Sequence, residues 1–210
     1  MFVINRKGLK EPVRYDQITD RNMELAQDLT KVDPAKLSQS VISSLKDGMT
    51  TAEIDILSAE TAFYMSAYEP EYDKLAARIA VRNLHKQTSY SFVETMKLIH
   101  SQINPHTGKR TNVINEEFLS FIESNREVLD TAIDYERDFS YGYFGFKTLE
   151  KSYLLKVNKK VVERPQHMVM RVACGIHSPN QALGKAGNLK AVLDTNLWAC
   201  AADILLPHCS

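Results

Sequence analysis

Apolar residues in the first part of the chain form a short β-prone run and then recur with helical spacing, which predicts a short β-hairpin followed by helices. Phe2–Ile4 is apolar and β-prone, Gly8 supplies a turn, and Glu11–Tyr15 resumes an extended run. We expect a helix over Ile18–Leu29 to begin at Asp16, because its carboxylate can accept hydrogen bonds from the N–H groups of the first turn.

Three more helices follow, each with its own start signal. Asp33, followed directly by a proline, is typical of a helix N-terminus. Thr50 and Glu53 fit a capping box, in which each side chain satisfies the other residue's backbone N–H, and this helix ends before Pro70. Glu71–Leu84 then gives a helix with an alanine-rich face. The first hairpin and these helices are predicted to form one small domain.

The rest of the chain is also predicted to be mainly helical. Ser89–Ile103 is amphipathic, with three large apolar residues on its inner face, and turn residues follow at Asn104–Gly108. The later elements are expected in this order: helices over Glu116–Asn125 and Arg126–Ile133, a hairpin through Asn158 and Lys159, and a helix over Met168–Ile176. The fold class is therefore mainly α, with an amino-terminal hairpin and a second short hairpin.

Composition narrows the classes of function. Lys and Arg together number 26, as do Asp and Glu, so no net charge favours nucleic acid as a partner. The chain has no apolar run of the roughly 20 residues that a membrane helix requires, and its start lacks the pattern of a signal peptide. We therefore expect a soluble, cytoplasmic protein with no membrane or nucleic-acid partner. Cys174, Cys200 and Cys209 form no CxxC pair, so we expect neither a disulfide framework nor a metal held by protein residues.

Two stretches suggest chemistry but also have ordinary structural explanations. Arg6 and Lys7, in a hairpin that leads into a helix start, are compatible with a phosphate site, although such residues are usually only solvated. Tyr135–Leu155 holds seven aromatic residues in 21 positions, which is compatible with stacking on unpaired bases. Because its flanks are not basic, we favour the packing of these rings in a core. His167 and Cys174 are likewise interpreted as structural residues.

Seven motifs together are similar to one family, the large subunit of class I ribonucleotide reductase of eukaryotic type. They occur in the family's order from Met1 to about His177, and several are long and nearly uninterrupted. The motifs are Met1–Arg6, Val32–Pro34, Thr50–Asp55, Leu75–Lys86, Ile103–Pro105, Asp138–Glu150 and Glu163–Met168. The resemblance implies an enzyme family that reduces ribonucleoside diphosphates to deoxyribonucleotides for DNA synthesis.

Residues 1–90 resemble the ATP cone of that family, which senses overall activity by binding ATP as activator or dATP as inhibitor, with Mg²⁺ accompanying the nucleotide. The resemblance implies that Arg6 and Lys86 lie near the phosphates and that Asp55 distinguishes ATP from dATP. Elementary chemistry agrees, because cations bind polyphosphate and a carboxylate can accept a hydrogen bond from a sugar hydroxyl. The full set that the resemblance implies for binding ATP or dATP is Asn5, Arg6, Glu11, Pro12, Val13, Arg14, Tyr15, Asp16, Gln17, Thr51, Asp55 and Lys86.

The later part of the chain resembles the family less completely. Residues 91–177 resemble the amino-terminal helical part of the large subunit, whereas residues 178–210 are expected to diverge and are a candidate for disorder. Asn5 and Gln17 stand where the family usually has lysine, which removes two cations from the phosphate neighbourhood. The catalytic barrel of the family, with its radical and redox cysteines, is expected to be missing. We therefore assign no catalytic residue and expect this chain, as a fragment, to be inactive by itself.

Two interpretations remain open for a chain of this kind. In the first, it is the allosteric, ATP- or dATP-sensing portion of a reductase large subunit, with other large subunits and the small radical-generating subunit as partners. In the second, it is a free-standing nucleotide-binding module that modulates the oligomerisation of full-length subunits. We expect ATP or dATP as the ligand in both.

Overall fold

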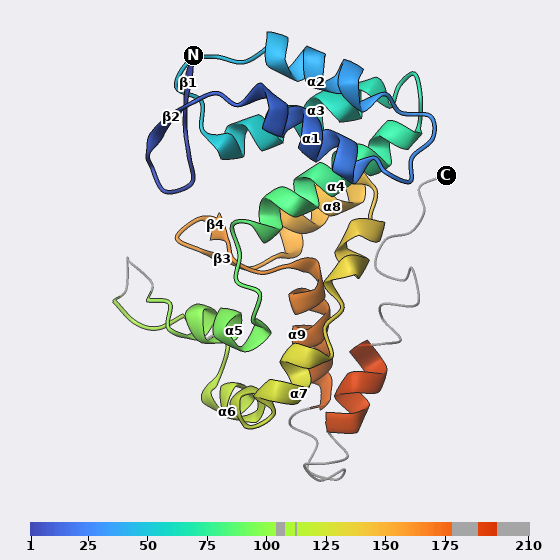
Figure 1. Ribbon diagram of the computed structural model, residues 1–210. Coiled ribbons are helices and arrows are strands. Elements are labelled where there is room, and N and C mark those ends of the chain that lie inside the picture. Colours follow the sequence, from blue (N-terminus) through green and yellow to red (C-terminus); the bar gives the residue numbers. More distant parts are fainter. Residues whose placement is uncertain (104–107, 112, 178–188, 197–210) are drawn as a thin grey trace. The chain divides into compact units, whose positions relative to one another are not determined.

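The computed structural model describes residues 1–103, 108–111, 113–177 and 189–196. This part of the chain is mainly helical with two small antiparallel hairpins (Figure 1), so the predicted fold class is confirmed. The chain divides into two compact units, of which the first combines Met1–Lys86 with Phe139–Lys147, and the second combines Gln87–Asp138 with Thr148–Ser210. The turn predicted over residues 104–108 lies almost entirely outside the described residues.

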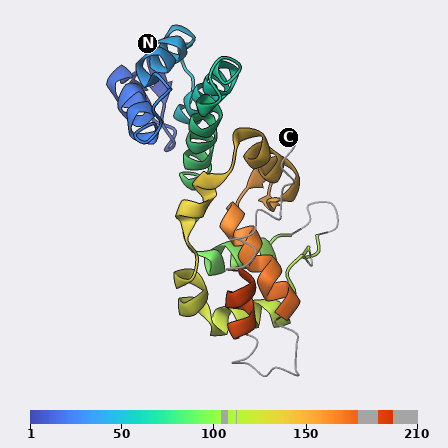
Figure 2. The same ribbon diagram turned by 90° about the vertical axis from the view of Figure 1, so that its right-hand side faces the viewer.

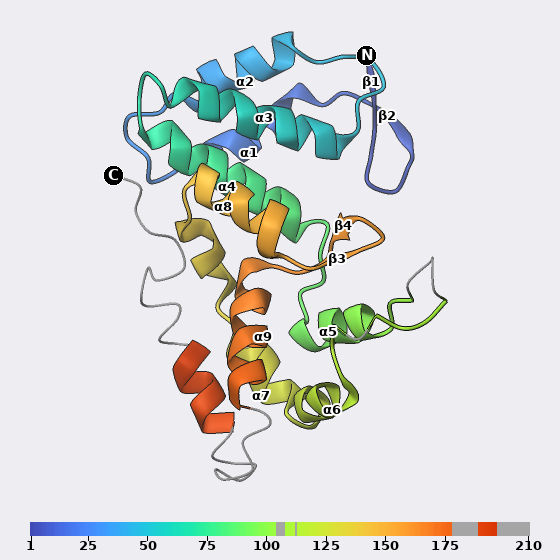
Figure 3. The same cartoon turned by 180° about the vertical axis from the view of Figure 1, so that it is seen from behind.

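The first unit is a hairpin with four helices beside it. Its elements are β1 (Phe2–Ile4), β2 (Lys10–Pro12), α1 (Tyr15–Leu25), α2 (Pro34–Ser43), α3 (Thr51–Met65) and α4 (Glu71–His85). The strands pair antiparallel with Val3 opposite Glu11. Helices α3 and α4 lie side by side, as Figures 1 and 3 show from opposite directions. Leu37, Val41 and Leu75 are fully buried between the helices, so the predicted apolar faces form the core of this unit.

Local start signals explain where α2 and α3 begin. The Asp33 carboxylate accepts hydrogen bonds from the N–H groups of Ala35 and Lys36, both at 3.0 Å, as expected of an N-cap. At α3, the Thr50 hydroxyl accepts from the Glu53 N–H and the Glu53 carboxylate accepts from the Thr50 N–H, so the predicted capping box is confirmed.

The start and end of α1 differ from the prediction. Asp16 does not cap the helix, because the chain turns helical directly after Arg14 and Asp16 is already the second helical residue. Its carboxylate instead accepts a hydrogen bond from the Arg14 guanidinium at 3.1 Å, which lowers the pKa of Asp16. Strand β2 ends at Pro12, but Arg14 still has extended backbone, so the extended run predicted up to Tyr15 is wrong only at Tyr15, where the helix begins. The helix also ends at Leu25, short of the predicted Leu29.

The aromatic stretch contributes a segment to the first unit. Within Phe139–Lys147, the Tyr143 N–H donates to both carboxylate oxygens of Asp73 at 3.3 Å, and the Tyr143 ring lies 4.8 Å from that of Phe63. Phe146, from the short helix α8 (Tyr143–Thr148), is fully buried. These contacts support the interpretation that rings such as Tyr143 and Phe146 pack in a core rather than stack on bases, although Phe144 and Tyr153 are largely exposed.

The second unit is built from short helices and a small hairpin. Its elements are α5 (Phe92–His100), α6 (Glu116–Ser124), α7 (Arg126–Thr131), most of a 3₁₀ helix (Tyr135–Ser140), a π-helix (Leu149–Tyr153), β3 (Lys156–Val157), β4 (Lys160–Val161), α9 (Pro165–His177) and a helix over 189–196. The hairpin turns through Asn158 and Lys159, both with positive φ, as a two-residue turn requires. Helix α9 begins three residues before the predicted Met168, since Pro165 suits the first helical position.

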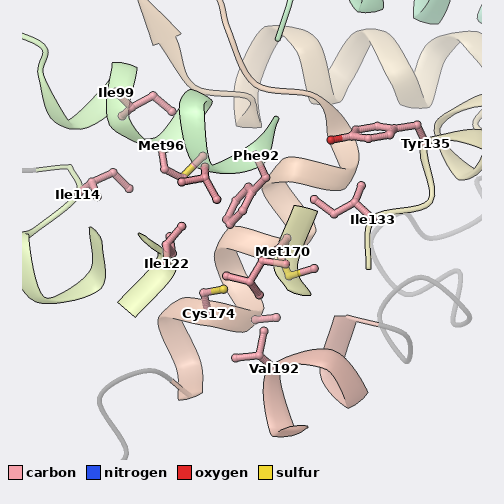
Figure 4. Close-up of a cluster of buried hydrophobic side chains, with 13 residues drawn as sticks. Phe92, Met96, Ile99, Ile114, Ile122, Ile133, Tyr135, Met170, Cys174 and Val192 are labelled. Carbon is pink, nitrogen blue, oxygen red and sulfur yellow. The ribbon is translucent and has the colours of Figure 1, made fainter. Parts of the chain in front are cut away.

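The core of the second unit lies between α5, α6 and α9. Phe92, Met96 and Ile99 point into it, which confirms the inner face expected for α5, and Met170 and Cys174 meet them from α9 (Figure 4). The helix over 189–196, drawn in red beside the orange α9 in Figure 2, adds the fully buried Val192. Residues 189–196, within the segment for which disorder was a candidate, thus form a helix that contributes to this apolar core.

Candidate functional site: a cationic cavity in the first unit

A cavity of about 220 Å³ opens between the first hairpin and three helices of the first unit. Helical spacing explains its walls, because residues three or four apart share one helix face. Thus α1 contributes one face, the first turn of α3 another, and the end of α4 a third. The lining residues are Val3, Arg6, Glu11, Pro12, Val13, Arg14, Gln17, Ile18, Arg21, Thr51, Ile54, Asp55, Arg82 and Lys86.

Asp55 is the centre of this cavity. Its side chain is only 4% exposed, and both carboxylate oxygens accept from cations. Oδ2 lies 2.9 Å from Arg6 Nη2 and 3.3 Å from Lys86 Nζ, and Oδ1 accepts from Arg21 Nη1. Arg21 also donates through Nη2 to the Ser58 hydroxyl at 3.0 Å. A single buried carboxylate therefore holds three cations that come from the hairpin, α1 and the end of α4.

The cavity carries more positive than negative charge. Five of its lining residues are cations (Arg6, Arg14, Arg21, Arg82, Lys86) and two are carboxylates (Glu11, Asp55). Burial, and the neighbouring Arg21, Arg6 and Arg82, lower the pKa of Lys86 to about 8. Burial and the same kind of repulsion, from Arg82 and Arg6, lower the pKa of Arg21 to about 10. Burial is the larger cause of both shifts, and the repulsion between neighbouring cations adds to it. The excess of cations in the lining makes the cavity suited to an anion.

Two further observations show that the arginines of the cavity have few buried hydrogen-bond or ion-pair partners. Arg21 Nε is buried and has no hydrogen-bond partner among the described residues. The Arg82 guanidinium pairs with Glu24 at 2.7 Å outside the cavity lining, and Arg14 pairs with Asp16 at 3.1 Å near the surface. An anion that enters the cavity would thus meet cations whose partners are few or solvent-exposed.

The structure brings most of the predicted site residues together. Nine of them line the cavity: Arg6, Glu11, Pro12, Val13, Arg14, Gln17, Thr51, Asp55 and Lys86. Asn5, Tyr15 and Asp16 do not line it. Asn5 instead shapes the hairpin turn, since its Oδ1 accepts from the N–H groups of Lys7 and Leu9 at 2.9 and 3.0 Å. These bonds explain why asparagine suits position 5, where the family usually has lysine.

Two cations of the cavity, Arg21 and Arg82, were not among the predicted site residues. Arg21 lies four residues after Gln17 on α1, and Arg82 lies four residues before Lys86 at the end of α4. Helical spacing from the residues already selected would therefore have found both.

A second cavity, of about 320 Å³, belongs to the second unit and is lined by Val113, Ile114, Asn115, Glu117, Phe118, Arg171, Val172 and Gly175. Its one cation, Arg171, is paired with the fully buried Glu163 at 2.6 Å. This cavity therefore offers an anion much less positive charge than the first cavity does.

The other residues singled out from the sequence have structural roles where they are described. His167 is fully buried, and its Nε2 lies 2.7 Å from the Tyr135 hydroxyl. Burial raises the pKa of the Cys174 thiol to about 12, so it is not a reactive thiolate at neutral pH. Cys200, His208 and Cys209 lie outside the described residues.

Within the described residues, no three His, Cys, Asp or Glu side chains gather closely enough to hold a metal ion. The same part of the chain has no helix with the length and hydropathy needed to cross a membrane.

Comparison with known proteins adds to this geometry. Residues 1–87 match the family described as ATP cone domain, and residues 139–201 match the family described as ribonucleotide reductase, all-alpha domain. The chain is 48% identical over 195 residues to the ribonucleoside-diphosphate reductase large chain 2 of Saccharomyces cerevisiae, a match that covers 91% of this chain and 22% of the yeast protein. It is 53% identical over 178 residues to the large subunit of Caenorhabditis elegans, covering 84% of this chain and 23% of the relative.

A third relative is aligned almost from end to end of this chain. The large subunit of Dictyostelium discoideum is 50% identical over 210 residues, covering 98% of this chain and 24% of the relative. This match and the all-alpha match both extend into residues 178–210, the segment that we expected to diverge. The chain spans less than a quarter of the length of these three relatives.

Proposed function

Because the chain belongs to the family of ribonucleoside-diphosphate reductase large subunits, of which it matches the amino-terminal part, we propose that its first unit is a regulatory site for ATP or dATP. The observation that carries the proposal is the convergence of Arg6, Arg21 and Lys86 on one buried carboxylate in a cavity with excess positive charge. Such a cavity fits a polyphosphate, because each phosphate oxygen can accept a charge-assisted hydrogen bond.

The two kinds of lining suit the two ends of the nucleotide. The cations take the triphosphate, with Arg6 and Arg21 offering several N–H groups each and Lys86 a mobile point charge. Apolar side chains, among them Val3, Ile18 and Ile54, line the same cavity and suit the face of a purine ring. Glu11, Gln17 and Thr51 supply polar groups for its edge and the sugar. Asn5, Tyr15 and Asp16 act indirectly, by shaping the hairpin turn and the start of α1.

Asp55 is proposed to distinguish the two effectors. A carboxylate can accept a hydrogen bond from the sugar hydroxyl that ATP has and dATP lacks. Loss of one such bond costs roughly 1 kcal/mol, which changes relative affinity several-fold. Any Mg²⁺ would enter with the nucleotide, bound by phosphate oxygens, and would neutralise part of the phosphate charge.

Regulation follows if the effectors differ in affinity for different assembly states. A nucleotide shifts such an equilibrium only by its differential affinity for the states, so ATP and dATP would favour different arrangements of large subunits and of the small radical-generating subunit. We propose that the 210-residue polypeptide does not itself reduce ribonucleotides. Cys174, the cysteine among the described residues, is fully buried with a raised thiol pKa and suits packing rather than redox chemistry.

Isothermal titration calorimetry with ATP and dATP tests the site. Wild-type protein is expected to bind both nucleotides, and Arg6→Ala is expected to weaken both by about tenfold or more, because it removes a charge-assisted phosphate contact. Lys7→Ala is the matched control, since it removes the next cation of the same hairpin, which does not line the cavity. Equal effects of the two substitutions, or no binding to the wild type, would contradict the proposal.

A further inference from the structure

Both oxygens of Asp55 are already occupied when the cavity holds no nucleotide. Oδ2 accepts from Arg6 and Lys86, and Oδ1 accepts from Arg21. A carboxylate oxygen accepts about two hydrogen bonds, so Oδ2 is full while Oδ1 has one acceptor position left. A sugar hydroxyl can therefore donate to Oδ2 only after Arg6 or Lys86 has moved away, and recognition of the sugar through Oδ2 requires a rearrangement that starts elsewhere in the cavity.

The three cations differ in how easily they can leave the carboxylate. The Arg21 side chain is 13% exposed and is also bonded to Ser58, whereas the side chains of Arg6 and Lys86 are 27% and 38% exposed. Arg6 lies in the hairpin turn just after β1, where it also donates to Asn83 Oδ1 at 2.5 Å, and Lys86 is the C-cap of α4. The two cations on Oδ2 are thus more exposed than Arg21 and lie at the ends of elements. They are the ones that can turn toward another anion, Arg6 with the loss of its bond to Asn83, while Arg21 stays on Oδ1.

We propose that Asp55 is an internal substitute for phosphate, which holds Arg6 and Lys86 in place in the empty cavity and gives them up to the phosphates of the effector. Effector binding is then an exchange of one anion for another. The exchange frees Oδ2, and only then can that oxygen accept from the sugar. Phosphate binding and sugar recognition are therefore coupled through the same carboxylate.

The electrostatics of the empty cavity agree with this role. Without a carboxylate between them, Arg6, Arg21 and Lys86 would repel one another in a partly buried space, which is costly. With it, they are held in an arrangement that a polyphosphate can take over with little change in position, which lowers the cost of ordering them on binding. The carboxylate nevertheless competes with the ligand, so the cavity binds polyphosphate less tightly than it would without this charge.

Inorganic tripolyphosphate is the probe that isolates the exchange, because it has no sugar or base. Calorimetric titration is expected to show that Asp55→Asn binds tripolyphosphate about tenfold more tightly than the wild type, since a competing ion pair has been removed. Glu11→Gln is the matched control. It removes a carboxylate of the same lining that, within the described part of the chain, accepts a side-chain hydrogen bond from Asn5 and from no cation. It should tighten binding by less than about threefold, the change expected for an exposed charge. Equal tightening in the two variants, or no tightening in Asp55→Asn, would overturn the proposal.

Thermal unfolding gives a second readout if Asp55→Asn folds poorly. Its melting temperature is expected to be several degrees lower than that of the wild type in a buffer without multivalent anions, because three cations have lost their counter-ion. Saturating tripolyphosphate should recover most of that loss and should raise the melting temperature of the variant more than that of the wild type. A rise that is equal or smaller in the variant would exclude the substitution of carboxylate by phosphate.

This inference rests on the proposed function only for the identity of the natural ligand, and the two can fail separately. If the wild type binds ATP and dATP but tripolyphosphate neither binds Asp55→Asn more tightly nor restores its stability, the regulatory site stands and the exchange is wrong. If tripolyphosphate gives both effects and the wild type binds neither nucleotide, the exchange stands and the nucleotide assignment is wrong.

Discussion

Single residues of the cavity carry charges that are adjusted by their surroundings, and Lys86 is the most sensitive of them. The groups around it are Arg6 from the hairpin turn, Arg21 and Glu24 from α1, Asp55 from α3, and Arg82 from its own helix. Its pKa of about 8 means that Lys86 begins to lose its proton just above neutral pH. A bound polyphosphate would raise this pKa, because negative charge favours the protonated amine. Nucleotide binding should therefore depend on pH in the slightly alkaline range.

We expect the affinity for ATP to be nearly constant between about pH 7 and 7.5, where the terminal phosphate is fully ionised, and to fall as the pH rises through 8, by up to about tenfold per pH unit. The reason is that free Lys86 must take up a proton before it can bind phosphate. Stability without ligand should change in the opposite direction. The folded pKa lies below the unfolded value of 10.5, so the free energy of unfolding should increase between about pH 8 and 10.5.

Calorimetry at several pH values, in buffers of different ionisation enthalpy, would detect the proton uptake. Lys86→Arg is the control, because a guanidinium keeps its charge throughout this range and its affinity should not vary with pH. A wild-type affinity that is independent of pH up to 9.5 would mean that Lys86 does not contact the phosphates.

At the scale of elements, α4 links the cavity to the segment Phe139–Lys147. One end of the helix carries Lys86, and near the other end Asp73 accepts hydrogen bonds from the N–H of Tyr143. The chain enters this contact through Gly142, where a Cβ atom would lie 2.8 Å from Asp73 Oδ2. The backbone of Gly142 does not have positive φ, so the constraint at this position is the close approach of the Asp73 carboxylate, which lies at the end of a flexible side chain.

Gly142→Ala is therefore expected to lower the free energy of unfolding by about 1 to 3 kcal/mol, because the Asp73 carboxylate must move away and lose its bonds to Tyr143. Gly175→Ala in α9 is the control. Its Cβ would lie 3.9 Å from Phe118, an ordinary contact, and alanine favours a helix, so stability should stay equal or increase. Urea unfolding of both variants and of the double variant Asp73→Ala with Gly142→Ala measures the effect. Full additivity in the double variant would show that the clash with Asp73 is not the cause.

The whole molecule shows which features the sequence could predict. Helix starts at Asp33 and Thr50 were predicted correctly because their capping bonds join residues two or three positions apart. The start of α1 was misplaced because two neighbouring polar residues compete there, and Asp16 pairs with Arg14 instead of capping. Arg21 enters the cavity through a contact with Asp55, 34 residues later in the chain. No local pattern contains such a contact, although helical spacing from known site residues points to it.

Local sequence patterns also could not predict that Phe139–Lys147 belongs to the first unit. The aromatic composition predicted packing but not its partners, because Phe63 and Asp73 lie 80 and 70 residues before Tyr143 in the chain. The chain thus leaves the first unit after Lys86, builds part of the second, and returns for nine residues before completing it. Stabilisation of the first unit by a ligand should therefore reach a segment that lies far from the cavity residues in sequence.

Hydrogen–deuterium exchange with and without ATP tests this organisation. At an ATP concentration of about 100 times Kd, binding stabilises the folded state by about 2.7 kcal/mol, so amides that exchange only when the first unit opens should exchange about 100-fold more slowly. We expect this slowing in α1, α3, α4 and Phe139–Lys147, and no comparable slowing in the core amides of α5 and α9. Arg6→Ala protein at the same ATP concentration should show a smaller effect in every protected segment. If Phe139–Lys147 keeps its exchange rate while α4 is protected, the segment does not unfold together with the first unit.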